Sequence, residues 1–140
     1  MNEGLPKEQR LYKKKAIQLL FEKGKGFNFY PFRVVVYAHD SEEGEPSIPR
    51  FLVSVSKKRF HHAVKRNRVK RLVREAWRRN KSEIIVNCEK KQITFDVALV
   101  YTATAILPYE DIEKKIKQLS LRFNNTYFLH DDKKNNTTAS

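Results

Sequence analysis

Lysine and arginine side chains are concentrated between residues 57 and 79. This segment contains eleven Lys or Arg and a single acid, Glu75, so it holds ten of the thirteen net positive charges of the 140-residue chain. A surface that needs only to be soluble would interleave Glu with the cations, because like charges four residues apart oppose helix formation. The concentrated charge therefore favours a polyanionic partner, and the predominance of arginine favours phosphate contacts and stacking on bases.

The same segment has helical spacing. An apolar stripe at offsets 0, 3, 4 and 7 is formed by Val69, Leu72, Val73 and Ala76. With about 100° of rotation per residue, the opposite side presents a nearly continuous polar and cationic row. That row consists of Asn67, Lys70, Arg71, Arg74 and Arg78, with Lys65 and Arg68 on its flanks. We predict a helix over residues 65–80 that packs on the core with one face and binds a partner with the other.

Charge alone does not distinguish RNA from DNA or from an anionic membrane surface. The apolar stripe of the basic helix is narrow and is needed for the core, which argues against membrane binding. We find no helix-turn-helix spacing, zinc-ligand pattern or dimer face, which argues against a DNA-binding regulator. RNA is the partner that these observations favour.

The sequence contains no recognisable catalytic constellation. A Ser/His/Asp set, a paired-carboxylate motif and a glycine-rich phosphate loop are all missing, so we predict no catalytic residue and no metal site on the protein. Asp96 lies within an apolar run, where a lone carboxylate is more often hydrogen-bonded for structure than used in catalysis. His61 and His62 are adjacent and lack the spacing of a structural zinc site.

Hydrophobic patterning predicts the elements that hold the basic helix. A first helix is predicted over residues 8–23 by apolar residues at helical spacing, namely Ala16, Ile17, Leu20 and Phe21. β-branched and aromatic residues predict strands over residues 32–37 and 50–56. The acidic, Gly- and Pro-containing residues 39–49 between them predict a solvated hairpin loop.

The C-terminal half adds a strand and a helix. Residues 93–101 have the composition of a largely buried strand, and Pro108 suits the first turn of a last helix. One face of that helix is marked by Ile112, Ile116, Leu119 and Phe123. The element order predicts an α/β fold of the α+β type, a two-layer sandwich with helices on one face of a mixed sheet. We expect one domain over residues 1–130, and a disordered polar tail over residues 131–140.

The chain contains one cysteine, Cys88, so it cannot form an intrachain disulfide and a reducing compartment is expected. No apolar run approaches the length of a membrane span, and the first residues lack the apolar stretch of a signal peptide. We therefore expect a soluble, cytoplasmic protein that does not associate with membranes.

Two sequence motifs make the predicted fold and function more specific. Ser54-Val55-Ser56-Lys57-Lys58 is followed by a basic run, residues 63–75, in which Arg-Asn-Arg-x-Lys-Arg occupies residues 66–71. This combination resembles the signature of the bacterial ribonuclease P protein, and the element order fits that family from about Arg10 to Phe128. The resemblance implies that the basic helix joins two parallel strands by a left-handed βαβ crossover, although such crossovers are usually right-handed.

The resemblance also implies partners. Family members bind a large catalytic RNA, and together they remove the 5′ leader of precursor tRNA by hydrolysis of a phosphodiester bond. The chemistry belongs to the RNA subunit and its Mg²⁺ ions, so the protein is an enzyme component without catalytic residues, and we expect it to be monomeric apart from the RNA. The RNA-subunit contacts of the family carry over to Arg66, Asn67, Arg68, Lys70, Arg71 and Arg74.

Family members hold the single-stranded leader in a cleft between the first helix and the open sheet face, where aromatics stack on bases and cations follow the backbone. The candidates for leader binding are Phe21, Phe32, Tyr37, Lys57 and Lys58. Phe21 and Phe32 could equally fill the core, and Tyr37 could be a partly buried tyrosine at the strand edge.

The chain departs from the family pattern at Ile17, where a phenylalanine is frequent, and at His61-His62, where a small turn containing glycine is frequent. The acidic residues 39–49 fit a lineage-specific insertion. A structural ribosomal-RNA-binding protein without a role in catalysis remains the alternative, because its composition would be the same. Only the signature at residues 66–71 separates the two functions.

Overall fold

The computed structural model describes residues 6–129. The polar tail predicted at residues 131–140 lies outside these residues. The described part contains one mixed four-stranded sheet, formed by β1 (Lys25–Phe29), β2 (Phe32–Asp40), β3 (Pro49–Val55) and β4 (Ile93–Tyr101). The strand order is β1-β2-β4-β3, with β4 antiparallel to β2 and parallel to β3. The predicted mixed sheet of the α+β class is confirmed.

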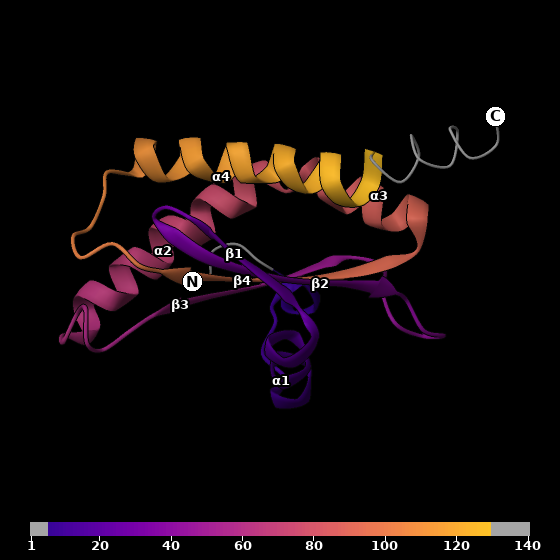
Figure 1. Cartoon of the computed structure of the whole chain (residues 1–140), viewed down its shortest axis with the longest axis horizontal. Coiled ribbons are helices and arrows are strands. Elements are labelled where there is room, and N and C mark those ends of the chain that lie inside the picture. Colours follow the sequence, from indigo (N-terminus) through magenta and orange to yellow (C-terminus); the bar gives the residue numbers. More distant parts are fainter. Residues whose placement is uncertain (1–5, 130–140) are drawn as a thin grey trace.

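Helices cover both faces of this sheet (Figure 1). They are α1 (Lys14–Lys23), α2 (Ala63–Asn80), α3 (Ser82–Lys91) and α4 (Tyr109–Phe123), with a 3₁₀ turn, η1 (Lys7–Gln9), before α1 and a π-helical turn, η2 (Asn124–Leu129), after α4. Helices α2, α3 and α4 lie on one face, whereas α1 lies alone on the other. The prediction that all helices share one face is therefore wrong for α1.

The strand β2 explains this placement. Three consecutive residues, Val34, Val35 and Val36, are buried, although neighbouring strand residues point to opposite faces. Val34 and Val36 belong to the main core beneath α2 and α4, whereas Val35 packs with Leu20 of α1 and Ala98 of β4. A run that is apolar at every position is typical of a strand that is covered on both faces.

The basic helix is seated on the main core as predicted. Val69, Val73 and Ala76 are fully buried, and Leu72 packs at the edge of the same cluster. The indole of Trp77 stacks on the ring of Phe51 with 4.7 Å between centroids. These contacts fix the rotation of α2 about its own axis, and hence decide which side chains point outward.

The segment between β3 and β4 contains two helices, α2 and α3, and connects two strands that are parallel neighbours. The crossover implied by the family resemblance is present, and its left-handed sense stays an expectation. The end of α2 at Asn80 agrees with the predicted helix over residues 65–80, whereas α3 was not predicted. The break lies at Lys81, and Asn80 turns back there to donate a hydrogen bond from its side chain to the carbonyl of Ala76 (2.8 Å).

Two elements near the N-terminus, the first helix and the first strand, differ from the prediction. The first helix begins at Lys14, because residues 10–13 run extended beside β3, where the N–H of Leu11 donates to the carbonyl of Phe51 (2.9 Å). Strand β1 was not predicted individually, since Lys-Gly-Phe-Asn-Phe lacks β-branched residues and contains glycine.

The acidic loop is shorter than predicted and does not close a hairpin. Strand β2 continues to Asp40 and β3 begins at Pro49, so the connection comprises residues 41–48. It passes β4, because β4 lies between β2 and β3 in the sheet. A hydrogen bond between the hydroxyls of Ser41 and Thr94 (3.0 Å) attaches this connection to β4, and one between Ser41 and Ser47 (2.8 Å) joins its two ends. Among residues 6–129, no helix is long and apolar enough to cross a membrane.

Candidate nucleic-acid interface

The outward side of α2 presents the predicted cationic row. Asn67, Arg68, Arg71 and Arg74 are exposed, and Lys70 is half-buried beside them. Within the described part of the chain, Arg68, Arg71 and Arg74 form no ion pair with a carboxylate. The guanidinium groups therefore project their full charge into solvent, where a phosphate can approach them from outside the helix.

Arg66 has a different position from the other residues of the signature. It is half-buried, and its Nη1 donates to the backbone carbonyls of Phe60 (2.9 Å) and His61 (2.8 Å). These bonds hold the turn that precedes α2 against the first turn of the helix. The Nη1 group of Arg66 therefore stabilises the protein's own backbone and is not available to RNA. The turn that it stabilises follows Lys57 and Lys58 in the chain.

The last turns of α2 are partly neutralised. The carboxylate of Glu75 accepts hydrogen bonds from Arg78 (2.7 and 3.1 Å) and Arg79 (3.0 Å). The hydrogen bond from Arg78 is the main cause that holds the pKa of Glu75 below its usual value. Spacings of three and four residues on a helix could have revealed this pairing in the sequence. The strongest uncompensated charge therefore lies nearer the start of α2.

Phe32 is a wrong candidate for leader binding. Only 1% of its surface is exposed, and its ring packs edge-on against Tyr101 in the main core, with 6.0 Å between centroids. A base cannot reach this ring without opening the core. Of the two roles that the sequence left open for Phe32, the structure supports core packing, because the side chain points towards the layer of α2 and α4.

Phe21, in contrast to Phe32, remains a candidate for leader binding. It is 49% exposed on α1, so it does not fill the core, and its ring is accessible to a ligand. Ile17, which stands where a phenylalanine is frequent in the family, packs at the edge of the small cluster beneath α1. Lys57 and Lys58 are exposed in the turn between β3 and α2. These three exposed residues, Phe21, Lys57 and Lys58, remain available for RNA.

Tyr37 lies on the face of the sheet that α1 covers, and its ring stacks on that of His39 with 4.8 Å between centroids. His39 was not among the predicted leader-binding residues, although residues two apart on a strand share a face. A groove of about 410 Å³ at the edge of β2 is lined by both rings and by Lys23. The two aromatic rings could present a stacking surface at this edge.

Helix α1 separates Tyr37 from Phe21. Lys23 borders the groove beside Tyr37, and Phe21 is rotated about 200° from Lys23 around the helix axis. Phe21 therefore points away from the side of α1 that borders the groove at Tyr37. Lys57 and Lys58 follow Val55, the last residue of β3, which pairs with Tyr101 of β4. Tyr37 pairs with Asp96, which lies five residues before Tyr101 on β4.

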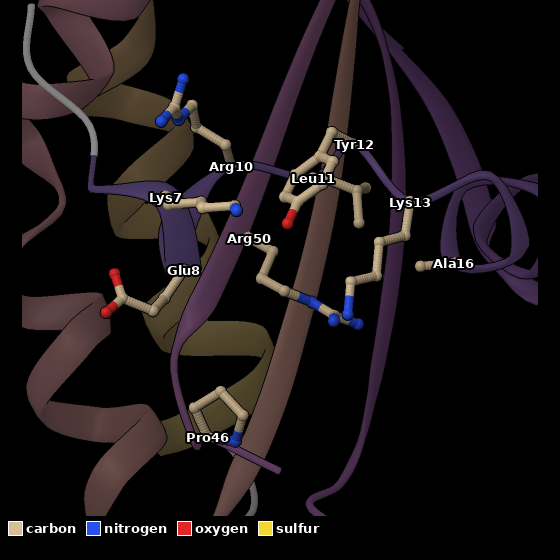
Figure 2. Close-up of a pocket in the computed structure, with 9 residues that line it drawn as sticks. All are labelled: Lys7, Glu8, Arg10, Leu11, Tyr12, Lys13, Ala16, Pro46 and Arg50. Atoms are coloured by element: carbon tan, nitrogen blue, oxygen red, sulfur yellow. The ribbon is translucent and has the colours of Figure 1, made fainter.

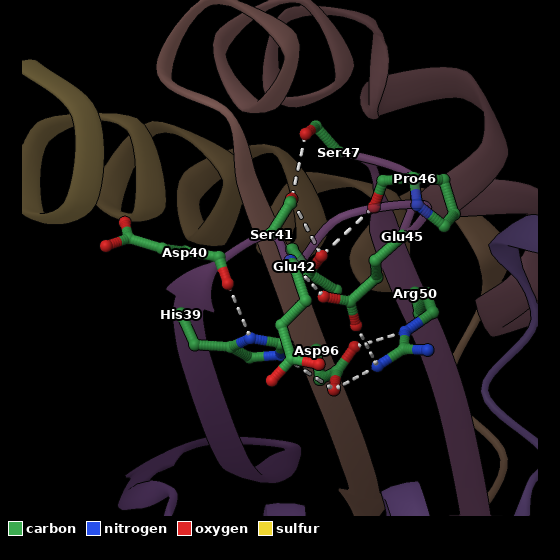
Figure 3. Close-up of polar contacts among 10 residues, drawn as sticks. His39, Asp40, Ser41, Glu42, Glu45, Pro46, Ser47, Arg50 and Asp96 are labelled. Atoms are coloured by element: carbon green, nitrogen blue, oxygen red, sulfur yellow. Dashed lines mark hydrogen bonds and ion pairs between the residues drawn. The ribbon is translucent and has the colours of Figure 1, made fainter.

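Asp96 is structural, as predicted. It is 2% exposed, and its two carboxylate oxygens accept hydrogen bonds from Arg50 at 2.7 and 2.8 Å (Figure 3). Nε2 of His39 lies 3.9 Å from the same carboxylate, and Glu45 lies 3.9 Å from Arg50. The hydrogen bond to Asp96 is the main cause that raises the pKa of Arg50. Cys88 is also buried, and this burial raises the pKa of its thiol to about 12.

Comparisons with known proteins agree with one another. The ribonuclease P family model matches residues 5–124. The ribonuclease P protein component of Porphyromonas gingivalis is 41% identical over 119 residues, which cover 85% of this chain and 85% of that protein. The corresponding protein of Bacillus cereus is 35% identical over 116 residues, covering 83% and 88% of the two chains.

Solved structures give the same result for the fold. The RNase P protein from Thermotoga maritima superimposes with a TM-score of 0.62 at 25% identity, covering 81% of this chain and 96% of its own. A mutant RNase P protein from Staphylococcus aureus superimposes with a TM-score of 0.62 at 25% identity, covering 80% and 85%. The structural similarity therefore extends over about four fifths of this chain.

Proposed function

Because the chain belongs to the ribonuclease P protein family, we propose that it binds the catalytic RNA of ribonuclease P and the 5′ leader of precursor tRNA. In this role it promotes the endonucleolytic removal of the leader, which produces the mature 5′ end of the tRNA. The observation that supports the proposal most directly is a set of exposed arginines on α2 without an acidic partner among residues 6–129, namely Arg68 and Arg71 of the Arg-Asn-Arg-x-Lys-Arg signature and Arg74. No comparison favours the alternative of a structural ribosomal-RNA-binding protein.

The RNA subunit binds, in this proposal, to the outer face of α2. Arg68, Arg71 and Arg74 would contact phosphates directly, because each is exposed and has no acidic partner among residues 6–129. Asn67 adds a neutral donor and acceptor on the same face. Arg66 would contribute mainly by holding the turn at Phe60 and His61, and Lys70 would support the row from one side.

The leader follows the side of α1 that bears Phe21. There an exposed ring can stack on a base, and Lys57 and Lys58 can neutralise the backbone that leads towards the start of α2. Phe32 is not part of this path, because it is buried. Tyr37 lies beyond α1, where it would contact RNA only through the groove that it shares with His39.

The hydrolysis is assigned to the RNA subunit and to Mg²⁺ ions bound by that RNA. Among the residues that the structure describes, no group of three or more His, Cys, Asp or Glu side chains is arranged to hold a metal ion. The protein's own contribution is binding and orientation, since its cations reduce the repulsion between two RNA molecules. Its cytoplasmic location and its monomeric state remain predictions.

Reconstitution tests this function. The chain is added to its cognate catalytic RNA at a low Mg²⁺ concentration, and cleavage of precursor tRNA is measured with and without protein. We expect clear stimulation, because protein cations replace part of the Mg²⁺ that would otherwise screen the two RNAs. Equal rates with and without the chain would exclude the function. Binding to ribosomal RNA without any stimulation would support the structural alternative.

A further inference from the structure

A pocket of about 300 Å³ lies near the N-terminal end of α1 (Figure 2). Its walls come from η1, from the extended residues 10–13, from the first turn of α1 and from the start of β3. None of the RNA contacts considered above uses this pocket. It is also distinct from the groove at Tyr37, with which it shares no lining residue.

The side chains that point into the pocket are mainly cationic. Figure 2 shows the ammonium groups of Lys7 and Lys13, the hydroxyl of Tyr12 and the guanidinium of Arg50 directed towards one space, whereas the carboxylate of Glu8 points away. Arg50 is compensated by Asp96, but neither lysine forms an ion pair within residues 6–129. The pocket therefore holds two uncompensated positive charges above a fixed guanidinium.

An aromatic ring borders these charges. Tyr12 is 52% exposed, and the ammonium of Lys7 lies 5.9 Å from the centre of its ring. An exposed aromatic ring beside cations is the usual arrangement for single-stranded nucleic acid, in which the base stacks and the phosphate is neutralised. The pocket's volume of about 300 Å³ is at the lower end of the range for small-ligand pockets, which suits a single nucleotide.

The walls are held in place by the protein itself. The side chain of Leu11 is buried, and its N–H donates to the carbonyl of Phe51 (2.9 Å). Gln9 accepts a hydrogen bond from the side chain of Lys81, which ties η1 to the junction of α2 and α3. Two hydrogen bonds to Asp96 orient Arg50. Binding would thus require little ordering of the backbone, which favours affinity.

We propose that this pocket binds one nucleotide of a single RNA strand, with its phosphate held by Lys7 and Lys13 and its base stacked on Tyr12. The proposal rests on the proposed function, because it takes RNA as the ligand. The strand is either the distal part of the leader or an unpaired segment of the catalytic RNA. Both present the same chemistry to the pocket, and the experiment below distinguishes them.

The first experiment uses the full chain without catalytic RNA. Binding of a fluorescent single-stranded oligoribonucleotide is measured by anisotropy over a range of salt concentrations. The Lys7→Ala/Lys13→Ala variant should bind about tenfold more weakly, and its log–log salt slope should be smaller by about 0.7, because the two lysines hold one phosphate. The matched control is Lys114→Ala/Lys117→Ala, which removes the same charge from exposed positions on α4.

The control variant should lose less than about twofold in affinity, because its lysines lie outside the pocket. Equal losses for both variants would overturn the proposal, since affinity would then follow net charge alone. Tyr12→Ala should weaken binding at least about fivefold, whereas Tyr12→Phe should retain it, because stacking needs the ring and not the hydroxyl. Unchanged binding by Tyr12→Ala would also overturn it. Thermal unfolding of each variant verifies that the fold is intact.

The second experiment identifies the strand. Holoenzyme assembled with each variant is titrated with precursor tRNAs whose leaders increase in length. A loss that appears only beyond a certain leader length supports the leader as ligand. A loss that is the same at every length, together with weaker binding of the RNA subunit, supports the catalytic RNA. No loss with either RNA would overturn the proposal. The oligonucleotide assay requires no cleavage, so failure of the proposed function would be recognised separately.

Discussion

Arg50 and Asp96 face each other across the parallel strands β3 and β4, and two hydrogen bonds of 2.7 and 2.8 Å join the guanidinium to the carboxylate. Asp96 is almost fully buried, and Arg50 is partly exposed at the pocket beside α1. Asp96 is thus buried in the sheet, whereas Arg50 lines the pocket that we propose as an RNA-binding site. Removing one partner should affect both stability and this surface.

We predict that Asp96→Asn destabilises the protein by about 2 kcal/mol. The substitution leaves Arg50 with only the more distant carboxylate of Glu45 (3.9 Å), and this contact and the partial exposure of Arg50 keep the loss below that of a fully buried pair. Urea unfolding measures the difference. Asp40→Asn is the matched control, because Asp40 is exposed at the end of β2, and its stability should be unchanged. Equal stability of the two variants would contradict the structural role of Asp96.

Arg68→Ala and Arg71→Ala should each weaken binding of the catalytic RNA, because both side chains are exposed on α2 without an acidic partner among residues 6–129. Each variant should flatten the log–log salt dependence of binding by about one phosphate contact. Filter binding at several salt concentrations provides the slopes. Lys117→Ala on α4 serves as the control for charge. A slope equal to that of the unmodified protein would show that the arginine does not contact phosphate.

Phe21→Ala and Phe32→Ala should separate binding from folding. Phe21 is exposed, so its loss should leave stability nearly unchanged and should weaken binding of precursor tRNA more than binding of mature tRNA. Phe32 is buried, so its truncation should cost about 3 kcal/mol of folding free energy. Thermal unfolding and tRNA titrations measure the two effects. Equal losses for precursor and mature tRNA would remove Phe21 from the leader path.

Glu75→Gln should increase the affinity of the chain for RNA, because it removes the negative charge that pairs with Arg78 and Arg79. The pKa of Glu75 is lowered by Arg78, so the small stability from this pair is present above its unfolded pKa and is lost as pH falls through its folded pKa. RNA titrations of both proteins near neutral pH provide the comparison. Unchanged or lower affinity of Glu75→Gln would mean that the last turns of α2 lie outside the interface.

The sequence by itself was sufficient to predict the basic helix and its two faces. Val69, Val73 and Ala76 repeat with the period of a helix, and this local pattern determines which face is buried and which is cationic. The Arg-Asn-Arg-x-Lys-Arg signature was likewise readable, because it lies on a single continuous element. The structural role of Asp96 could also be predicted, since a lone carboxylate in an apolar strand requires a hydrogen-bond partner.

Only the tertiary structure decided how distant segments meet. Phe21 and Phe32 are both aromatic residues in apolar patterns, and only the packing of α1 on one face and of α2 and α4 on the other leaves Phe21 exposed and Phe32 buried. The pocket of Lys7, Tyr12, Lys13 and Arg50 forms because residues 10–13 run beside β3 instead of continuing the helix. Helical and strand periods depend on neighbouring residues, whereas these contacts depend on the long-range pairing of strands, which no local pattern encodes.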